Sequence, residues 1–184
     1  MPLIFQKISG FFIYSTDNIW YSVNRISTII MNISQLSKFL VRAKINTYAS
    51  SGEGGENLLP DGNKEFRFKE KEFRYRDRYF GFNPFVGQEV VFQNGKIVWG
   101  INYYGRAISK SIPPKQIYQF LQEALKKIPK DEPFRGPRRF KKNNFQYLNK
   151  IKGTVEKFEG EEKISYKGKL VSVLVYRGGI ILEK

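Results

Sequence analysis

The stretch that decides the fold is residues 79–106, with the sequence YFGFNPFVGQEVVFQNGKIVWGINYYGR. Its Asn94-Gly95 dipeptide favours a two-residue β-turn, because both residues tolerate a positive φ angle. Apolar residues flank this turn on both sides, Val90 to Phe92 before it and Ile97 to Trp99 after it. The pattern therefore predicts a β-hairpin in which Phe92 pairs with Ile97 and Val90 pairs with Trp99.

This pairing assigns the hairpin side chains to two faces, because successive residues of a strand point to opposite sides of the sheet. The predicted core face carries Val90, Phe92, Ile97, Trp99, Ile101 and Tyr103. The predicted opposite face carries Glu89, Val91, Val98, Asn102 and Tyr104, together with Gly87 and Gly100. A carboxylate, an amide and a phenol would then surround two positions without side chains, which favours a hollow for a ligand.

The composition excludes several kinds of chemistry. The 184-residue chain has no cysteine, which excludes disulfides, thiolate nucleophiles and cysteine-bound metal centres. It has no histidine, which removes the usual general base and the commonest metal ligand. No metal or cofactor is expected, and any catalysis would depend on carboxylates, Tyr, Lys, Arg or a hard cation held by oxygen ligands.

The net charge of +15 raises the question of a nucleic-acid partner. Residues 113–152 hold eleven Lys or Arg and three Asp or Glu, so a net +8 lies in this one segment. A lysine-rich, solvated surface is the alternative explanation.

Residues 1–30 are apolar and aromatic, but polar residues such as Asp17 interrupt them, so no bilayer span of roughly 20 apolar residues fits there. Asn32 is a predicted helix N-cap, with Gln35 three positions later. We therefore expect residues 1–30 to be a loosely attached or non-native extension and residues 31–184 to be a single domain. The cytoplasm is the default location, with no membrane partner.

The rest of the pattern predicts the fold class. Apolar residues at helical spacing predict amphipathic helices from Ile33 to about Tyr48 and from Pro113 to Pro129. Strand patterns surround them, including expected strands at residues 145–148, 153–158 and 163–166. We expect an α+β fold, with a curved antiparallel sheet of about seven strands and both helices on one side.

Two basic segments are candidate nucleic-acid contacts. In the first, residues 67–78, Arg74 and Arg76 alternate with aromatic residues, as in proteins that bind single strands. The second is a loop with Arg135 followed by Arg138, Arg139, Lys141 and Lys142. A half-buried strand and a solvated loop are the structural alternatives.

Several motifs together resemble an uncharacterised prokaryotic family, domain of unknown function 5680, over about residues 36–182. The motifs are Ala43-Lys44, Thr47-Tyr48-Ala49, Tyr75-Arg76-Asp77, Tyr79-Phe80-Gly81, Phe85 to Val91, Gly95-Lys96, Val98-Trp99-Gly100, Asn102 to Arg106, Arg135-Gly136-Pro137 and Gly178-Gly179. Fusion of some members to a repressor-type helix-turn-helix implies a regulatory or effector role. Residues 1–30 are too short and too apolar to be that DNA-binding domain, and the resemblance implies no established activity.

Three functions remain open. The first is a binding module for a small polar or phosphorylated ligand, with a site made of Asp77, Glu89, Asn102, Tyr104, Arg106 and Arg135. The second is nucleic-acid binding by the two basic segments. The third is an enzyme in which carboxylates such as Asp77 and Glu89 do acid–base work. For Glu89 the structural alternative is a buried ion pair with Arg76 or Arg106.

Overall fold

A computed structural model describes residues 4–8, 11–16, 19–22, 31–51 and 54–182. Its main feature is an open, nine-stranded antiparallel sheet in the order β10-β11-β12-β13-β9-β8-β7-β6-β5. The strands are β5 (Asn57–Leu58), β6 (Lys64–Glu70), β7 (Phe73–Gly81), β8 (Phe85–Gln93), β9 (Lys96–Ala107), β10 (Arg139–Lys142), β11 (Phe145–Thr154), β12 (Lys157–Tyr166) and β13 (Lys169–Ile180). Most neighbours in the sheet are also neighbours in sequence, so the topology is largely a meander.

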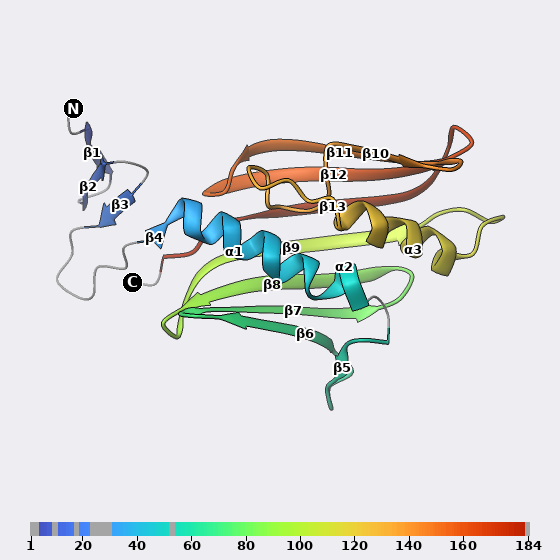
Figure 1. The fold of residues 1–184 in the computed structure, drawn as a ribbon, viewed down its shortest axis with the longest axis horizontal. Helices are drawn as coiled ribbons and strands as arrows, with labels where there is room; N and C mark the ends of the chain where they lie inside the picture. The colour runs from blue at the N-terminus through green and yellow to red at the C-terminus, as the bar shows by residue number, and fades with distance from the viewer. Residues whose placement is uncertain (1–3, 9–10, 17–18, 23–30, 52–53, 183–184) are drawn as a thin grey trace.

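Two helices cover one face of this sheet, as the sequence predicts (Figure 1). Helix α1 (Ile33–Ile45) begins at Asn32, whose side chain accepts a hydrogen bond from the backbone N–H of Gln35. Helix α3 (Pro114–Leu125) has proline at its first position, where no backbone donor is needed. A short helix α2 (Tyr48–Ser51) follows α1. We call the covered side of the sheet the inner face and the other side the outer face.

The α+β class and the antiparallel sheet are confirmed, but the expected number of about seven strands is wrong. The short edge strands β5 and β10 lie in segments whose Gly, Pro and charged residues predict loops. The expected strand at residues 153–158 is also wrong. Thr154 pairs with Lys157, so this segment contains the turn between β11 and β12.

A separate four-stranded sheet precedes helix α1 and consists of β1 (Ile4–Ile8), β2 (Phe11–Thr16), β3 (Ile19–Ser22) and β4 (Met31–Asn32). Residues 1–3, 9–10, 17–18 and 23–30 lie outside the described part, so the expected extension at residues 1–30 stays a prediction. Among the helices that are described, none combines the length and the apolar character needed to cross a membrane.

The central hairpin has the predicted turn but not the predicted pairing. Asn94 and Gly95 have φ angles of 50° and 86°, and Phe92 pairs with Ile97 as expected. A β-bulge then shifts the register, so that Trp99 pairs with Val91 and not with Val90. Val98 is the extra residue, and both Val98 and Trp99 are buried in the core.

The bulge changes which residues share a face, because a shift of one residue moves every following side chain to the other side of the sheet. The inner face carries Glu89, Val91, Trp99, Ile101 and Tyr103. The outer face carries Val90, Phe92, Asn102, Tyr104 and Arg106. The prediction that Glu89, Asn102 and Tyr104 surround one hollow is therefore wrong.

Candidate functional site

A cavity lies between the inner face of the sheet and the helices, and it is partly open to solvent. About 50 Å³ of it is available to the centres of water-sized molecules, which is room for several waters or one small ligand group. Its polar lining is Lys44, Thr47, Asp77, Glu89 and Arg135. Its aromatic and aliphatic lining is Tyr48, Tyr75, Tyr79, Phe82, Phe85, Tyr103, Tyr118, Leu121, Leu125 and Ile128.

Two carboxylates lie side by side at this cavity because Asp77 on β7 pairs in register with Glu89 on β8. Both side chains point to the inner face and are buried. The Tyr103 hydroxyl donates a hydrogen bond to Asp77 Oδ1 over 2.6 Å. The ring of Tyr103 lies over Gly87, where a Cβ atom would overlap the phenol. The side-chain-free position expected at Gly87 therefore makes room for this tyrosine.

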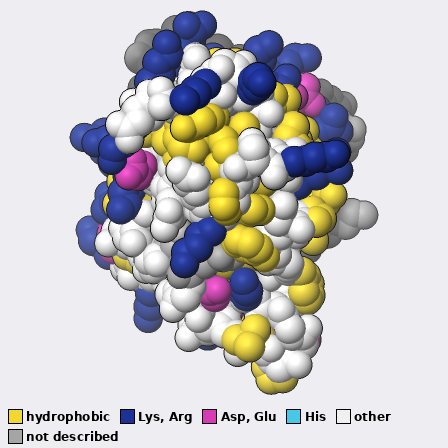
Figure 2. Space-filling view, turned by 90° about the vertical axis from the view of Figure 1, so that its right-hand side faces the viewer, with side chains coloured by type: hydrophobic (Ala, Val, Ile, Leu, Met, Phe, Trp, Pro, Cys, Tyr) yellow, Lys and Arg dark blue, Asp and Glu magenta, His cyan; other side chains and the backbone are white. Residues whose placement is uncertain are grey.

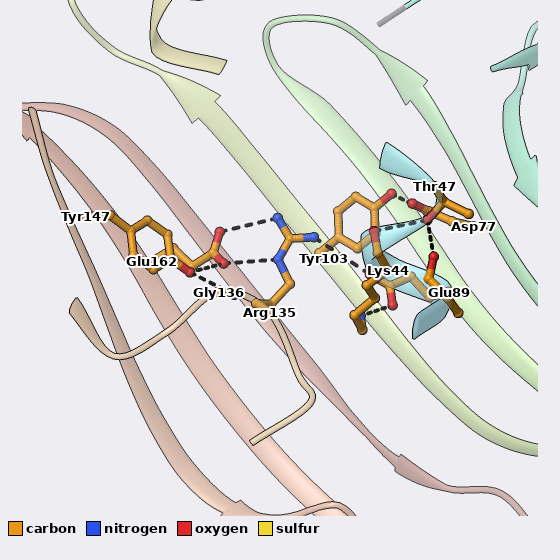
Figure 3. A network of polar contacts seen from close by, with 10 residues as sticks. Lys44, Thr47, Asp77, Glu89, Tyr103, Arg135, Gly136, Tyr147 and Glu162 are labelled. Atoms are coloured by element: carbon orange, nitrogen blue, oxygen red, sulfur yellow. Dashed lines mark hydrogen bonds and ion pairs between the residues drawn. The ribbon is translucent and has the colours of Figure 1, made fainter. Parts of the chain in front are cut away.

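Two cations, Lys44 and Arg135, form ion pairs with Glu89 and with a third carboxylate nearby (Figure 3). Lys44 of α1 donates a hydrogen bond from Nζ to Glu89 Oε2. Arg135, from the connection between α3 and β10, has its Nη1 3.7 Å from Glu89 Oε1. The same guanidinium binds Glu162 on β12 with two hydrogen bonds, of 3.0 Å from Nε and 3.3 Å from Nη2.

Glu162 is held from a second side by Tyr147 of β11, whose hydroxyl donates to Glu162 Oε1 over 2.6 Å. The Tyr147 hydroxyl also accepts the backbone N–H of Gly136 at 3.2 Å. Arg135 is thus fixed through its neighbour Gly136 and through its own side chain. We call Lys44, Asp77, Glu89, Arg135 and Glu162 the buried charge cluster.

Burial changes the acid–base properties of the cluster. It raises the pKa of Asp77 to about 7, with the adjacent Glu89 charge as the second cause. Burial lowers the pKa of Lys44, against the attraction of Glu89. It also raises the pKa of Tyr103 well above its ordinary value, so that this phenol keeps its proton and remains a hydrogen-bond donor.

The arrangement suits recognition of a small polar group. Asp77 carries a proton part of the time at neutral pH, so its carboxyl group can donate as well as accept hydrogen bonds. Two acidic groups in different environments are also the arrangement that acid–base catalysis uses. Among the residues that the structure describes, no group of three acidic, histidine or cysteine side chains is placed to hold a metal ion.

The structure brings together three of the six predicted ligand residues, namely Asp77, Glu89 and Arg135. It places the other three on the outer face, where Asn102 accepts a hydrogen bond from Gln88 and where Tyr104 and Arg106 are exposed. Arg76 and Arg106 were suggested as partners of Glu89. This suggestion is wrong, because both arginines lie on the outer face. Lys44 and Arg135 take their place.

Sequence reasoning missed Lys44, Tyr103 and Glu162 as members of the site. The prediction that Lys44 lies away from the apolar stripe of its helix is wrong, because Lys44 follows Leu40 by four positions and Leu36 by eight and so lies on the buried side of α1. Tyr103 was assigned to the face opposite Glu89. The bulge, which was not predicted, brings it to the inner face, where it contacts Asp77. Glu162 had no signal in the sequence.

The predicted nucleic-acid residues fall into two groups. Arg135 is buried in the charge cluster, Arg138 pairs with Glu132, and Lys142 pairs with Glu123. Arg139 and Lys141 are exposed on edge strand β10. On the outer face, the Cζ atoms of Arg74 and Arg76 lie 5.2 and 5.3 Å from the ring centre of Phe92. One end of the molecule, in Figure 2, has Lys and Arg spread around its edge and hydrophobic side chains between them. In the predicted loop, Arg135, Arg138 and Lys142 therefore each have a carboxylate partner.

Fold and site together define an α+β protein with a half-covered antiparallel sheet and a charged cavity under its helices. The profile of the family described as "domain of unknown function (DUF5680)" matches residues 77–181, more than half of the chain, and the chain belongs to this family. The match begins at Asp77 and includes Glu89, Arg135 and Glu162, whereas Lys44 lies before it. Neither the curated proteins nor the solved structures contain a significant match to this chain.

Proposed function

We propose that this protein is a binding module that holds a small polar ligand in the cavity between helices α1 and α3 and the inner face of the sheet. The observation that carries the proposal is Asp77, a buried carboxyl group at a partly open cavity with aromatic walls. This replaces the ligand site with Asn102 and Tyr104, while Asp77, Glu89 and Arg135 are retained. A regulatory or effector role fits a module that binds a ligand.

A purely structural role accounts for part of the cluster. The pairs Lys44–Glu89 and Arg135–Glu162 satisfy one another and connect α1 and the loop at Arg135 to the sheet. Asp77 is a further buried acid that forms no ion pair among the described contacts, and its burial costs free energy that an apolar residue would not cost. Strongly shifted acids in clefts are typical of functional sites, so Asp77 favours the binding role.

A filled-cavity variant tests this proposal. Leu125→Phe adds a ring to the cavity wall, and Val175→Phe makes the same kind of change on the outer face, where Val175 is exposed. Ligand-observed NMR with a panel of small neutral, cationic and anionic compounds should detect binders of the native protein. We expect Leu125→Phe to lose them and Val175→Phe to keep them. A panel without binders, or binders that Leu125→Phe retains, would contradict the cavity.

Nucleic-acid binding is the second candidate, and the outer face is what favours it. Arg74 and Arg76 lie beside the ring of Phe92, and further along the same face Tyr104 and Arg106 are exposed. Exposed aromatic rings among cations suit stacking of bases and contact with phosphates. This surface is wider than the predicted basic segments and includes two residues first assigned to the ligand site.

Charge reversal distinguishes this second candidate. The outer-face variant replaces Arg74, Arg76, Arg139 and Lys141 with Glu, and the control replaces Lys126 and Lys127 after helix α3. If the outer face binds nucleic acid, a labelled single-stranded oligonucleotide should bind weakly at high salt and tightly at low salt, and only the outer-face variant should lose it. No binding at the lower salt concentration would exclude this function.

Catalysis by Asp77 and Glu89 is the third proposal, because both acids adjoin the same cavity.

A further inference from the structure

The buried charge cluster does not balance by itself. It contains three carboxylates, on Asp77, Glu89 and Glu162, and two cations, on Lys44 and Arg135. With every group ionised, the cluster would carry one uncompensated negative charge. The shortest contacts pair Lys44 with Glu89 and Arg135 with Glu162, so the excess charge falls on Asp77.

An uncompensated charge is costly in a buried environment, and two kinds of particle can remove it. One is a proton on Asp77, consistent with the raised pKa of this carboxyl group. The other is a monovalent cation at the same place, which leaves Asp77 ionised and the cluster neutral. An anionic ligand would add to the imbalance, because the two internal cations already have carboxylate partners.

The cavity walls also suit a cation. Lys44 shows how an ammonium group is held beside this cavity, since its Nζ lies 6.0 Å from the ring centre of Tyr75, which lines the cavity, and 5.7 Å from that of Trp99 in the core. Further aromatic rings line the cavity. Tyr118 packs edge-on against Phe82 at 5.4 Å and against Phe85 at 5.6 Å between ring centres. Because these rings line the cavity, they give a short carbon chain apolar surface to pack against.

We propose that the ligand of this cavity is a small organic cation, a primary amine in its ammonium form, held by the Asp77 carboxylate with its carbon chain against the aromatic walls. This inference rests on the proposed binding function and names the chemical class of its ligand. The space of about 50 Å³ suits an ammonium group with a short chain.

Three probes of one size test the charge preference. n-Butylammonium, n-butanol and butyrate are similar in length and differ in charge, and their dissociation constants can be measured by NMR titration. We expect n-butylammonium to bind at least about tenfold more tightly than the other two. Asp77→Asn keeps the shape of the side chain and removes its charge, and it should weaken n-butylammonium by about tenfold or more while leaving n-butanol nearly unchanged.

Two controls keep the result interpretable. Glu161→Gln removes a carboxylate from the outer face, where Glu161 pairs with Lys163, and should leave all three affinities unchanged. If Asp77→Asn does not fold, Leu125→Phe supplies the site-specific loss, because it blocks the cavity without removing a charge. Binding of n-butylammonium that survives in folded Asp77→Asn, or in Leu125→Phe, would overturn the inference.

The outcomes separate the two proposals. Equal or tighter binding of butyrate or n-butanol in the cavity would reject the amine and retain the binding module. If none of the three probes binds, the amine is rejected. The binding module is rejected as well only if the wider panel of compounds also fails.

Discussion

Tyr103 and Tyr104 are neighbours on strand β9, and they belong to two different environments. The Tyr103 ring is 6% exposed on the inner face, and its hydroxyl donates to a buried carboxyl group. Tyr104 is 47% exposed on the outer face, beside Val86 and Val175 in the adjoining strands. Both faces of this sheet contain tyrosine and glutamate side chains. Burial under the helices is what makes the charges of the inner face energetically and chemically important.

Ion pairs show the same difference between the faces. Arg135 and Glu162 are both buried, whereas Arg177 and Glu159 on the outer face lie 3.3 Å apart with largely exposed side chains. An exposed pair is screened by water and contributes little to stability, but a buried pair leaves an uncompensated charge when one partner is lost. Changes at matched positions on the two faces measure this difference.

Insertion of one alanine between Trp99 and Gly100 should have the largest effect, because it shifts every later residue of β9 by one position against β8. With the extra residue, either Ile101 and Tyr103 turn outward or the strand pairing is lost. We expect no cooperatively folded protein, as measured by circular dichroism and thermal unfolding. Insertion of one alanine after Gly54, in an exposed turn, serves as the control. A stable protein with the insertion after Trp99 would show that the fold does not need Ile101 and Tyr103 on the inner face.

Arg135→Met should lower the free energy of unfolding by about 3–5 kcal/mol, because Glu162 and Glu89 would lose a buried partner. Arg177→Met on the outer face should change it by no more than about 0.5 kcal/mol. Urea unfolding of both variants measures the difference. Equal losses would show that the inner charges are no more important for stability than the outer ones.

Asp77→Asn should change how stability depends on pH. The pKa of Asp77 is about 7 in the folded protein and has an ordinary value of 3.8, so the folded state binds its proton more tightly. This group therefore stabilises the native protein at low pH, and its contribution falls as the pH rises from about 4 to 7. The chain has no histidine, so few other side chains titrate between about pH 5.5 and 7.5.

Urea unfolding at several pH values checks this prediction. In native protein, the part of the slope due to Asp77 should be negative between about pH 5.5 and 7, and Asp77→Asn should remove that part. Glu161→Gln on the outer face should keep the native slope. A slope that is the same in native protein and Asp77→Asn would mean that Asp77 has an ordinary pKa.

Tyr103→Phe should have the smallest effect of the four, about 1–3 kcal/mol less stability, because Asp77 would lose its hydrogen-bond donor while remaining buried. The same substitution at Tyr104 should have almost no effect, since that side chain is exposed. Loss of the donor should also raise the pKa of Asp77 further. NMR titration of the carboxyl carbon would detect this shift, and an unchanged pKa would contradict the role given to Tyr103.

Local signals predicted much of the fold. The Asn94-Gly95 turn, the Asn32 cap with Gln35 and the helix after Pro113 all depend on residues close together in sequence. Strands β5 and β10 were not predicted, because edge strands are short and need no alternating apolar pattern. The candidate site was predicted in part, because Asp77, Glu89 and Arg135 were selected for their chemistry and not for their neighbours.

The sequence alone determined the fold class, the two amphipathic helices, the tight turn of the central hairpin and the lack of cysteine and histidine chemistry. The tertiary structure decided which side chains meet. A single extra residue at Val98 reverses the face of every later residue of β9, and it is retained because Val98 and Trp99 can both be buried. The energy of that burial depends on residues distant in the chain, and alternation along one strand does not encode it.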